Sequence, residues 1–363
     1  MVEWLAGNRI SGTTAEKNTL KVIEGGWKEL DRTTTGSAAN SYTVSGLADK
    51  RYLMILTSYT ANGSLNGGMR LNGDTGNNYY RRSEDDGGTS TTATISSLSD
   101  VWGYGGSHEN GFQVSYIANK SDKEKLVIIR HASTGSTGSG NSNYQIPSMR
   151  WSNEKWANTS ASVSSATIGS FYAGAGSFDS GSEIVVLGWD SADTHTDNFW
   201  EQLADVELSG SNASLSSGTI TAKKYLWVQY YIGDRPETNY DQMIFNSDSG
   251  TNYNQREIRN DTGSGTRYNN SSIYSVPETN PSTSPTFFNG FIVNRSNKEK
   301  LLTAQCFAQN TAGANAPSER YVIAGKWANT SNQITNITVN AKLVNGNNST
   351  FPSGSFIKVW GHD

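Results

Sequence analysis

The chain has little of several residue types on which other classes of protein depend. Cys306 is the only cysteine among 363 residues, which excludes an internal disulfide and argues against a structural zinc site. Its alternating polar and apolar neighbours predict a small buried side chain in a strand. Only 17% of residues are charged, and 29 basic residues face 33 acidic ones. This balance shows no basic excess for binding nucleic acid.

Long apolar runs and long helix-forming runs are also missing. No segment approaches the roughly 18 apolar residues of a transmembrane helix, and the N-terminal stretch lacks the basic and apolar regions of a secretory signal. We therefore expect a protein made in the cytosol that does not bind membranes. What is abundant is 37 Gly, 17 Tyr and 10 Trp, together with many Ser, Thr and Asn residues. Turn formers and strand formers in this mixture predict an all-β fold.

One hexapeptide, KWANTS, occurs twice, at 155–160 and at 326–331. Five longer segments match in the same way, and all the matches are offset by 171 to 175 residues. Alternating apolar and polar runs predict about seven to nine short strands in each copy, as in a β-sandwich or jelly roll. We expect two tandem, duplicated, jelly-roll-like sandwiches with an extended N-terminal arm. The predicted parts are the arm at 1–26, the first repeat at 27–190, the linker at 191–199 and the second repeat at 200–363.

No motif with a chemical mechanism is present. The four histidines have no metal-ligand spacing, and no nucleophile elbow or phosphate-binding loop occurs. A glycosidase needs two facing carboxylates, but Glu183 of the first copy is replaced by Phe356 in the second. We therefore predict a protein without enzymatic activity, catalytic residues or cofactor.

Two repeated stretches have competing interpretations. Asp74 and Asp248 lie among Asn, Ser, Thr and Gly oxygens, which suits a Ca²⁺ site. The favoured alternative is an Asx-turn, in which the Asp side chain accepts hydrogen bonds from backbone N–H groups. Lys-Glu-Lys recurs at 123–125 and 298–300. It could form a docking patch, but a solvated hairpin loop is the favoured interpretation.

Aromatic residues beside polar ones suggest a sugar-binding site. Tyr or Trp rings stack on pyranose rings, while Asn, Asp and Arg bind the hydroxyl groups. The candidate glycan-binding residues are Tyr79, Tyr80 and Arg82 in the first copy and Tyr231, Asp234 and Arg235 in the second. Tryptophans that recur in both copies are instead expected to fill cores or domain contacts, namely Trp27, Trp200, Trp156 and Trp327.

The phrases EWLAGNRISGTTAEK, GWKELDRTT, KRYLMILTSY, NGDTGNNY, NKSDKEKL, KWANTS and GSFIKVWG carry a family resemblance. They resemble tandem β-sandwich structural proteins of tailed viruses that infect environmental, marine-type prokaryotes. The resemblance implies a capsid-surface decoration or fibre component located in the virion. Its expected partners are copies of itself, with a trimer among the options, and other capsid or tail proteins. The alternative function is a carbohydrate-binding module or adhesin that uses loop aromatics to bind host surface glycans.

Overall fold

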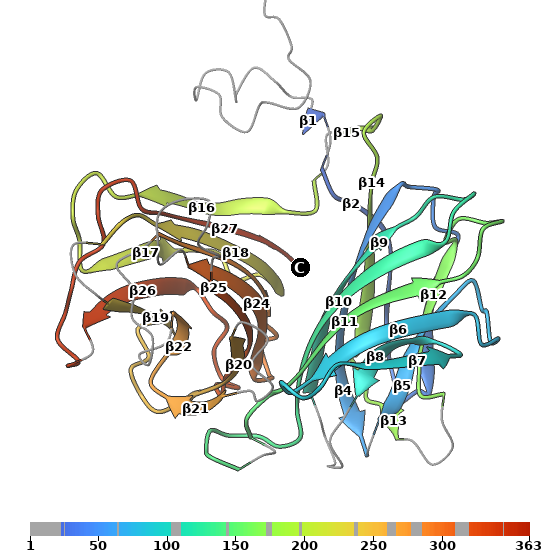
Figure 1. Cartoon of the computed structure of the whole chain (residues 1–363), viewed down its shortest axis with the longest axis horizontal. Helices are drawn as coiled ribbons and strands as arrows, with labels where there is room; N and C mark the ends of the chain where they lie inside the picture. The colour runs from blue at the N-terminus through green and yellow to red at the C-terminus, as the bar shows by residue number, and fades with distance from the viewer. Residues whose placement is uncertain are drawn as a thin grey trace, which may run out of the picture.

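The chain is all-β. Its structure, a computed structural model, describes residues 23–24, 26–63, 65–102, 110–142, 145–171, 176–195, 198–235, 239–259, 266–276, 285–308, 319–343 and 345–363. Every regular element in these ranges is a strand, and every strand pair is antiparallel (Figure 1). Within the same ranges, no helix is long and apolar enough to span a membrane.

The first half of the chain forms a sandwich of a large and a small sheet. The large sheet has the order β2-β14-β4-β9-β10-β11-β6-β7, with β13 paired to β4. Its strands are β2 Lys28–Thr34, β4 Tyr52–Asn62, β6 Tyr79–Asp85, β7 Thr91–Ile95, β9 Asn110–Ala118, β10 Lys125–Thr134, β11 Ser148–Trp156, β13 Ser177–Phe178 and β14 Glu183–Trp189. The small sheet has the order β3-β12-β5-β8, formed by β3 Ser41–Ser45, β5 Asn66–Leu71, β8 Leu98–Trp102 and β12 Ser165–Gly169.

The second half forms another sandwich of the same kind. Its large sheet has the order β16-β27-β18-β23-β24-β25-β20-β21, and its small sheet has the order β17-β26-β19-β22. The strands of the large sheet are β16 Glu201–Glu207, β18 Tyr225–Ile232, β20 Tyr253–Arg259, β21 Thr266–Asn270, β23 Thr286–Val293, β24 Lys300–Ala308, β25 Glu319–Trp327 and β27 Phe356–His362. Those of the small sheet are β17 Ser214–Thr219, β19 Asn239–Phe245, β22 Ile273–Val276 and β26 Asn336–Leu343.

The two large sheets share one strand order. Read from the edge, β2, β14, β4 and β9 hold the places of β16, β27, β18 and β23. The next four strands, β10, β11, β6 and β7, hold those of β24, β25, β20 and β21. Segments with matching sequence therefore occupy matching positions in the two sandwiches.

Each sandwich encloses its own apolar core between the large and small sheets. In β3, alternate residues are buried, so that Tyr42 and Val44 face inward while their neighbours face water. Leu53 and Ile55 of β4 join them from the large sheet in one cluster of the first half. Full burial of each such side chain stabilises the fold by roughly 1.5–3 kcal/mol. In the second half, Cys306 belongs to the corresponding core, as its alternating sequence predicts.

The repeated hexapeptide has a structural role in each half. Trp156 is buried, and its Nε1 donates a 2.7 Å hydrogen bond to Asp74 Oδ2. Trp327 makes the same 2.7 Å contact with Asp248. The Oδ1 atom of each aspartate also accepts a hydrogen bond from the backbone N–H two residues later. The loops are Asx-turns tied to a buried tryptophan, which is the favoured interpretation from the sequence.

The Lys-Glu-Lys stretches differ from the prediction of a solvated loop. Lys123 is exposed, but Lys125 is fully buried. The Nζ atom of Lys125 donates to the carbonyl oxygens of Lys123, at 2.8 Å, and Asn158, at 2.9 Å. Lys300 contacts the equivalent carbonyls in the second half. The last lysine of each stretch therefore holds the KWANTS segment against the hairpin, so the prediction was wrong for this position.

The predicted arm and linker meet at one point. Residues 1–22 and residue 25 of the arm lie outside the described residues. Strand β1, Ile23–Glu24, pairs with β15, Thr194–His195, which lies in the predicted linker. The end of the arm is thereby joined to the segment between the two sandwiches (Figure 1).

Candidate functional site

The outer face of the first large sheet carries adjacent rows of apolar side chains. In the strand register, Trp189 lies opposite Tyr52, Tyr52 lies opposite Ala118, and Ala118 lies opposite Leu126. Side chains opposite one another share a face of the sheet, so these four form one row across β14, β4, β9 and β10. The next row along the same strands consists of Leu187, Met54, Tyr116 and Ile128.

A groove of about 580 Å³ lies over the first row and over Tyr116 and Ile128 of the second, while Met54 and Leu187 are buried in the cluster between the halves. The Tyr52 and Trp189 rings stack in it with centroids 5.3 Å apart and an interplanar angle of 25°. Three large apolar side chains stay exposed, Tyr52 by 40%, Leu126 by 59% and Ile128 by 46%. Scattered apolar side chains are normal on a surface, but a contiguous patch marks an interaction site.

The groove offers little polar chemistry. Of the polar residues that line it, Asn153 lies opposite Ile128 on the outer face, whereas Glu154 lies opposite the core residue Val127 and is 4% exposed. The groove therefore does not present the facing carboxylates that a glycosidase needs. Among the described residues, no group of three or more His, Cys, Asp or Glu side chains could hold a metal ion. The arrangement is suited to binding an apolar surface.

The equivalent positions of the second half are covered. Tyr225, Phe291 and Leu301 match Tyr52, Tyr116 and Leu126, yet they are only 0%, 5% and 1% exposed. They belong to an apolar cluster that joins the halves and includes residues of the first large sheet, namely Met54, Leu56, Phe112, Val114, Val185 and Leu187. The same kind of surface is therefore an interface in one half and open in the other.

A repeated ion pair shows the same contrast. Glu124 and Lys155 are 2.9 Å apart on the first half, and their side chains are 41% and 39% exposed. Their counterparts Glu299 and Lys326 are only 1% and 0% exposed. The loop between β10 and β11 covers them, because Gly138 N donates to Glu299 Oε1 at 2.6 Å and Lys326 Nζ donates to Gly138 O at 2.7 Å.

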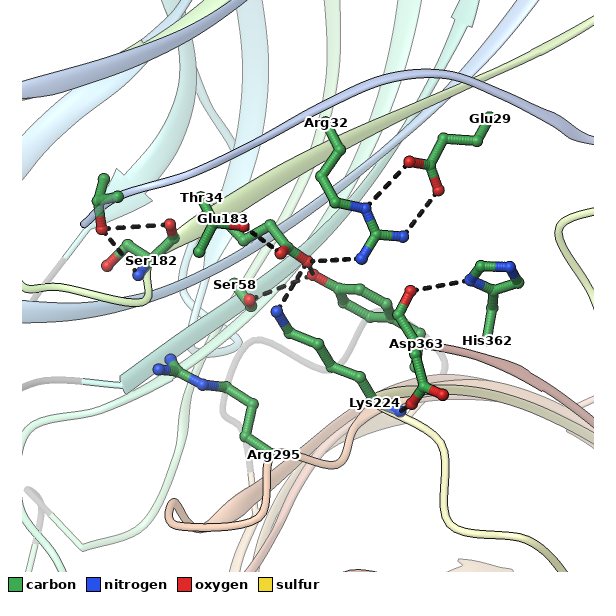
Figure 2. Close-up of polar contacts among 12 residues, drawn as sticks. Glu29, Arg32, Thr34, Ser58, Ser182, Glu183, Lys224, Arg295, His362 and Asp363 are labelled. Atoms are coloured by element: carbon green, nitrogen blue, oxygen red, sulfur yellow. Dashed lines mark hydrogen bonds and ion pairs between the residues drawn. The ribbon is translucent and has the colours of Figure 1, made fainter.

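The interface between the halves has a polar cluster around Glu183 (Figure 2). Glu183 Oε1 accepts hydrogen bonds from Tyr225 Oη and lies within 2.8 Å of Lys224 Nζ, both from the second half. Its Oε2 accepts from Thr34 Oγ1 at 2.5 Å, and Arg32 Nη1 lies 3.5 Å from Oε1. One carboxylate of the first sandwich thus binds two side chains of the second.

Electrostatics explain why Glu183 is ionised although it is only 4% exposed. Burial alone would raise its pKa, but hydrogen bonds from Lys224, Thr34 and Tyr225 hold the pKa of Glu183 below its usual value. Arg295 also faces the cluster and donates to Thr60 Oγ1 at 3.4 Å, and burial lowers its pKa. The cluster ties the sandwiches together at a defined position.

Of the predicted sugar-binding residues of the first half, Tyr79 is separated from the other two, because Tyr80 and Arg82 lie on the outer face of the large sheet, opposite Lys155 and Asn153. Tyr79 is fully buried, and its hydroxyl donates to Leu71 O and Asp74 O. It therefore offers no face to a sugar. Tyr80 is 45% exposed, and Arg82 lines a separate depression of about 460 Å³ farther along β6.

Those of the second half are also separated. Tyr231 stacks on Phe356 at a centroid distance of 5.7 Å, and Asp234 is exposed in the loop after β18. Arg235 is buried, and its Nη2 binds both carboxylate oxygens of Asp241 at 2.8 Å. This arginine has a structural partner in the interior and is not a surface ligand.

The open groove was missed from the sequence, although a signal for it exists. The stretch LVIIR of β10 is apolar at successive positions, and a strand with apolar residues on both sides has both faces covered. Val127 and Ile129 fill the core, so Leu126 and Ile128 belong to a second apolar face. That pattern indicates a contact beyond the sandwich itself.

Comparisons with known proteins give no relatives by sequence. No family model and no curated protein matches the chain. Among solved structures, the LG1–3 region of the laminin α2 chain is 10% identical with a TM-score of 0.20, and 89% of this chain and 64% of that chain are covered. The mouse laminin α1 chain, domains LG4–5, is 10% identical with a TM-score of 0.16, and the covered shares are 93% and 91%. The chain thus spans about 64% of the laminin α2 region, and likenesses this weak carry no argument about function.

Proposed function

We propose that this chain is a non-enzymatic structural protein of a virus particle, a capsid-surface decoration or fibre component. It assembles through the outer face of its first sandwich. One observation carries the assembly part of the proposal: Tyr52 and Leu126 are open to water, whereas the matching Tyr225 and Leu301 form a protein–protein contact. The outer face of the second large sheet forms an interface within the molecule, so the similar outer face of the first large sheet is suited to form one with another protein.

The architecture suits a building block. The apolar cluster and the Glu183 cluster hold two sandwiches together, so the open face is presented on a body larger than one domain. The viral assignment is supported by the resemblance of phrases such as KWANTS and NKSDKEKL to virion proteins. An N-terminal arm that orders on a neighbouring subunit belongs to the same proposal.

A second candidate is carbohydrate binding, favoured by the exposed Tyr52 ring stacked on the half-buried Trp189 ring. Aromatic rings of this kind can stack on sugar rings. The groove has few polar groups to bind hydroxyls, however, because Glu154 faces the interior and Asn153 remains as its polar lining residue on the outer face. A sugar would satisfy its hydroxyls poorly there, so we rank this function second.

Fractionation of the source culture tests the viral assignment. An antiserum raised against the purified chain is used to probe DNase-resistant particles separated on a density gradient. The proposal expects the protein in the particle fraction, in step with the major capsid protein. Recovery in the cell envelope or the free protein fraction alone would contradict it. Sugar-dependent quenching of Trp189 fluorescence, lost in Trp189→Phe, would favour the second candidate.

A further inference from the structure

The contact between the two halves uses different surfaces on each side. On the second half it uses the Tyr225 patch, defined as Tyr225, Phe291, Leu301 and Val293. On the first half it uses the Phe112 patch, defined as Leu56, Ser58, Phe112, Glu183 and Val185. Phe112 and Tyr225 stack at 6.2 Å, and Ser58 Oγ lies 3.3 Å from Tyr225 Oη. Nearer its centre the contact brings together the equivalent residues Tyr116 and Phe291, whose centroids are 6.3 Å apart, so the two surfaces are unlike only at the end that holds Phe112 and Tyr225.

Each half has a counterpart of both surfaces. The first half has the Tyr52 patch, defined as Tyr52, Leu126 and Ala118, at positions of the Tyr225 patch. The second half has the Phe287 patch, defined as Gln229, Tyr231, Phe287, Phe356 and Lys358, at the positions of the Phe112 patch. Within one chain neither counterpart is covered, since Leu126 is 59% and Phe287 is 39% exposed.

We propose that the Tyr52 patch of one molecule docks on the Phe287 patch of a second copy of the chain. This contact would pair, between molecules, the open counterparts of the two patches that meet inside each molecule. The inference rests on the proposed function, in which the open face is an assembly surface, and it names the partner that binds there. Because the two surfaces differ, each bound copy exposes a fresh surface of either kind, and the assembly grows head to tail or closes into a ring.

The apolar residues of the two contacts correspond in part. Tyr52 repeats Tyr225, and Leu126 repeats Leu301. On the opposing side, Phe287 repeats Phe112, while Gln229 and Lys358 replace Leu56 and Val185. Phe307, 41% exposed, lies beside Phe287 in the register and enlarges the apolar surface. Burial of these rings and of Leu126 supplies the main driving force for docking.

The basic residue of the internal contact is repeated, whereas its acidic partner is shifted to a neighbouring strand. Lys224, which binds Glu183 in the internal contact, is matched by the exposed Arg51 on the first half. Phe356 replaces Glu183 in the Phe287 patch, but Glu207 lies opposite Phe356 in the register of β16 and β27. A carboxylate therefore remains available one strand away for Arg51 of the docking copy. This pairing adds direction to an otherwise apolar contact.

Mixing two variants, each capped by a substitution that blocks one of the two patches, tests the inference. Leu126→Glu blocks the Tyr52 patch and leaves the Phe287 patch intact, while Phe287→Glu does the reverse. Both side chains are substantially exposed, so both variants fold as the wild type does. We expect the wild type to assemble and each variant alone to remain monomeric. An equimolar mixture should form a dimer at twice the 39.3 kDa of one chain, by sedimentation velocity, and grow no further.

The controls make the outcome decisive. Thr43→Glu, an exposed change on β3 of the small sheet, should assemble as the wild type does. Arg51→Glu should weaken association at least tenfold, and a partner carrying Glu207→Arg should restore it. The inference would be overturned if the wild type were monomeric or if either capped variant associated on its own. It would also be overturned if the mixture stayed monomeric while the wild type assembled. If the protein is found in virus particles but the mixing test fails, the proposed function still holds, and the open face binds a partner other than a second copy of the chain.

Discussion

Replacing Glu183 by Gln should loosen the junction between the sandwiches. The side chain of Glu183 is 4% exposed, and the change leaves Lys224 and Arg32 beside a neutral amide. Removing one member of a buried ion pair costs about 3–5 kcal/mol. Since Lys224 is 22% and Arg32 25% exposed, water screens part of the loss, and we expect about 2–3 kcal/mol at pH 7.

Urea unfolding of the full chain, followed by tryptophan fluorescence, measures this change. Glu29→Gln is the matched control, because Glu29 also binds Arg32 but is 32% exposed, and it should cost less than about 1 kcal/mol. The same experiment repeated across pH gives a second readout. The pKa of Glu183 is lowered in the folded state, so its contribution is present above its usual value and is lost as pH falls through the folded pKa. The reasoning would be refuted if both substitutions had an equal, small effect on the free energy of unfolding. It would also be refuted if Glu183→Gln left the loss of stability at low pH unchanged.

Two further predictions concern buried polar groups inside the sandwiches. Burial raises the pKa of Glu257 to about 7 from 4.5, so the folded state binds the extra proton and the free energy of unfolding should fall as pH rises from about 4.5 to above 7. Glu257→Gln should flatten this dependence in urea titrations, and an unaltered slope would contradict it. Lys125→Met removes the donor that two carbonyl oxygens share and should cost about 1–3 kcal/mol. Lys123→Met, at a 69% exposed position, should stay within about 0.5 kcal/mol, and equal costs would show that the buried contacts contribute little.

The fold class could be predicted from the sequence because local chemistry determines it. Strand formers separated by Gly, Ser, Thr and Asn leave few alternatives to antiparallel sheets, and the alternation around Cys306 places it correctly in a core. The Asx-turn at Asp74 was predictable for the same reason, since its partners lie within a few residues, except Trp156. Interactions between residues that are close in the sequence can therefore be predicted from the sequence alone.

The site could be predicted much less well, because burial depends on distant partners. Tyr79 and Tyr80 are adjacent tyrosines, yet β-alternation puts the first in the core and leaves the second exposed. Arg235 has the composition of a surface ligand, but its partner Asp241 lies on the next strand inside the sandwich. Leu126 and Leu301 have nearly the same local sequence and opposite exposure. Only the packing of the two halves distinguishes them.

Sedimentation velocity of wild type and Leu126→Glu across a concentration series tests the central claim most directly. The claim is that the open outer face of the first sandwich is an assembly surface. It predicts that wild type sediments as species heavier than 39.3 kDa that increase with concentration, while Leu126→Glu remains at the mass of one chain. Identical sedimentation of the two proteins, whether as monomers or as assemblies, would contradict it.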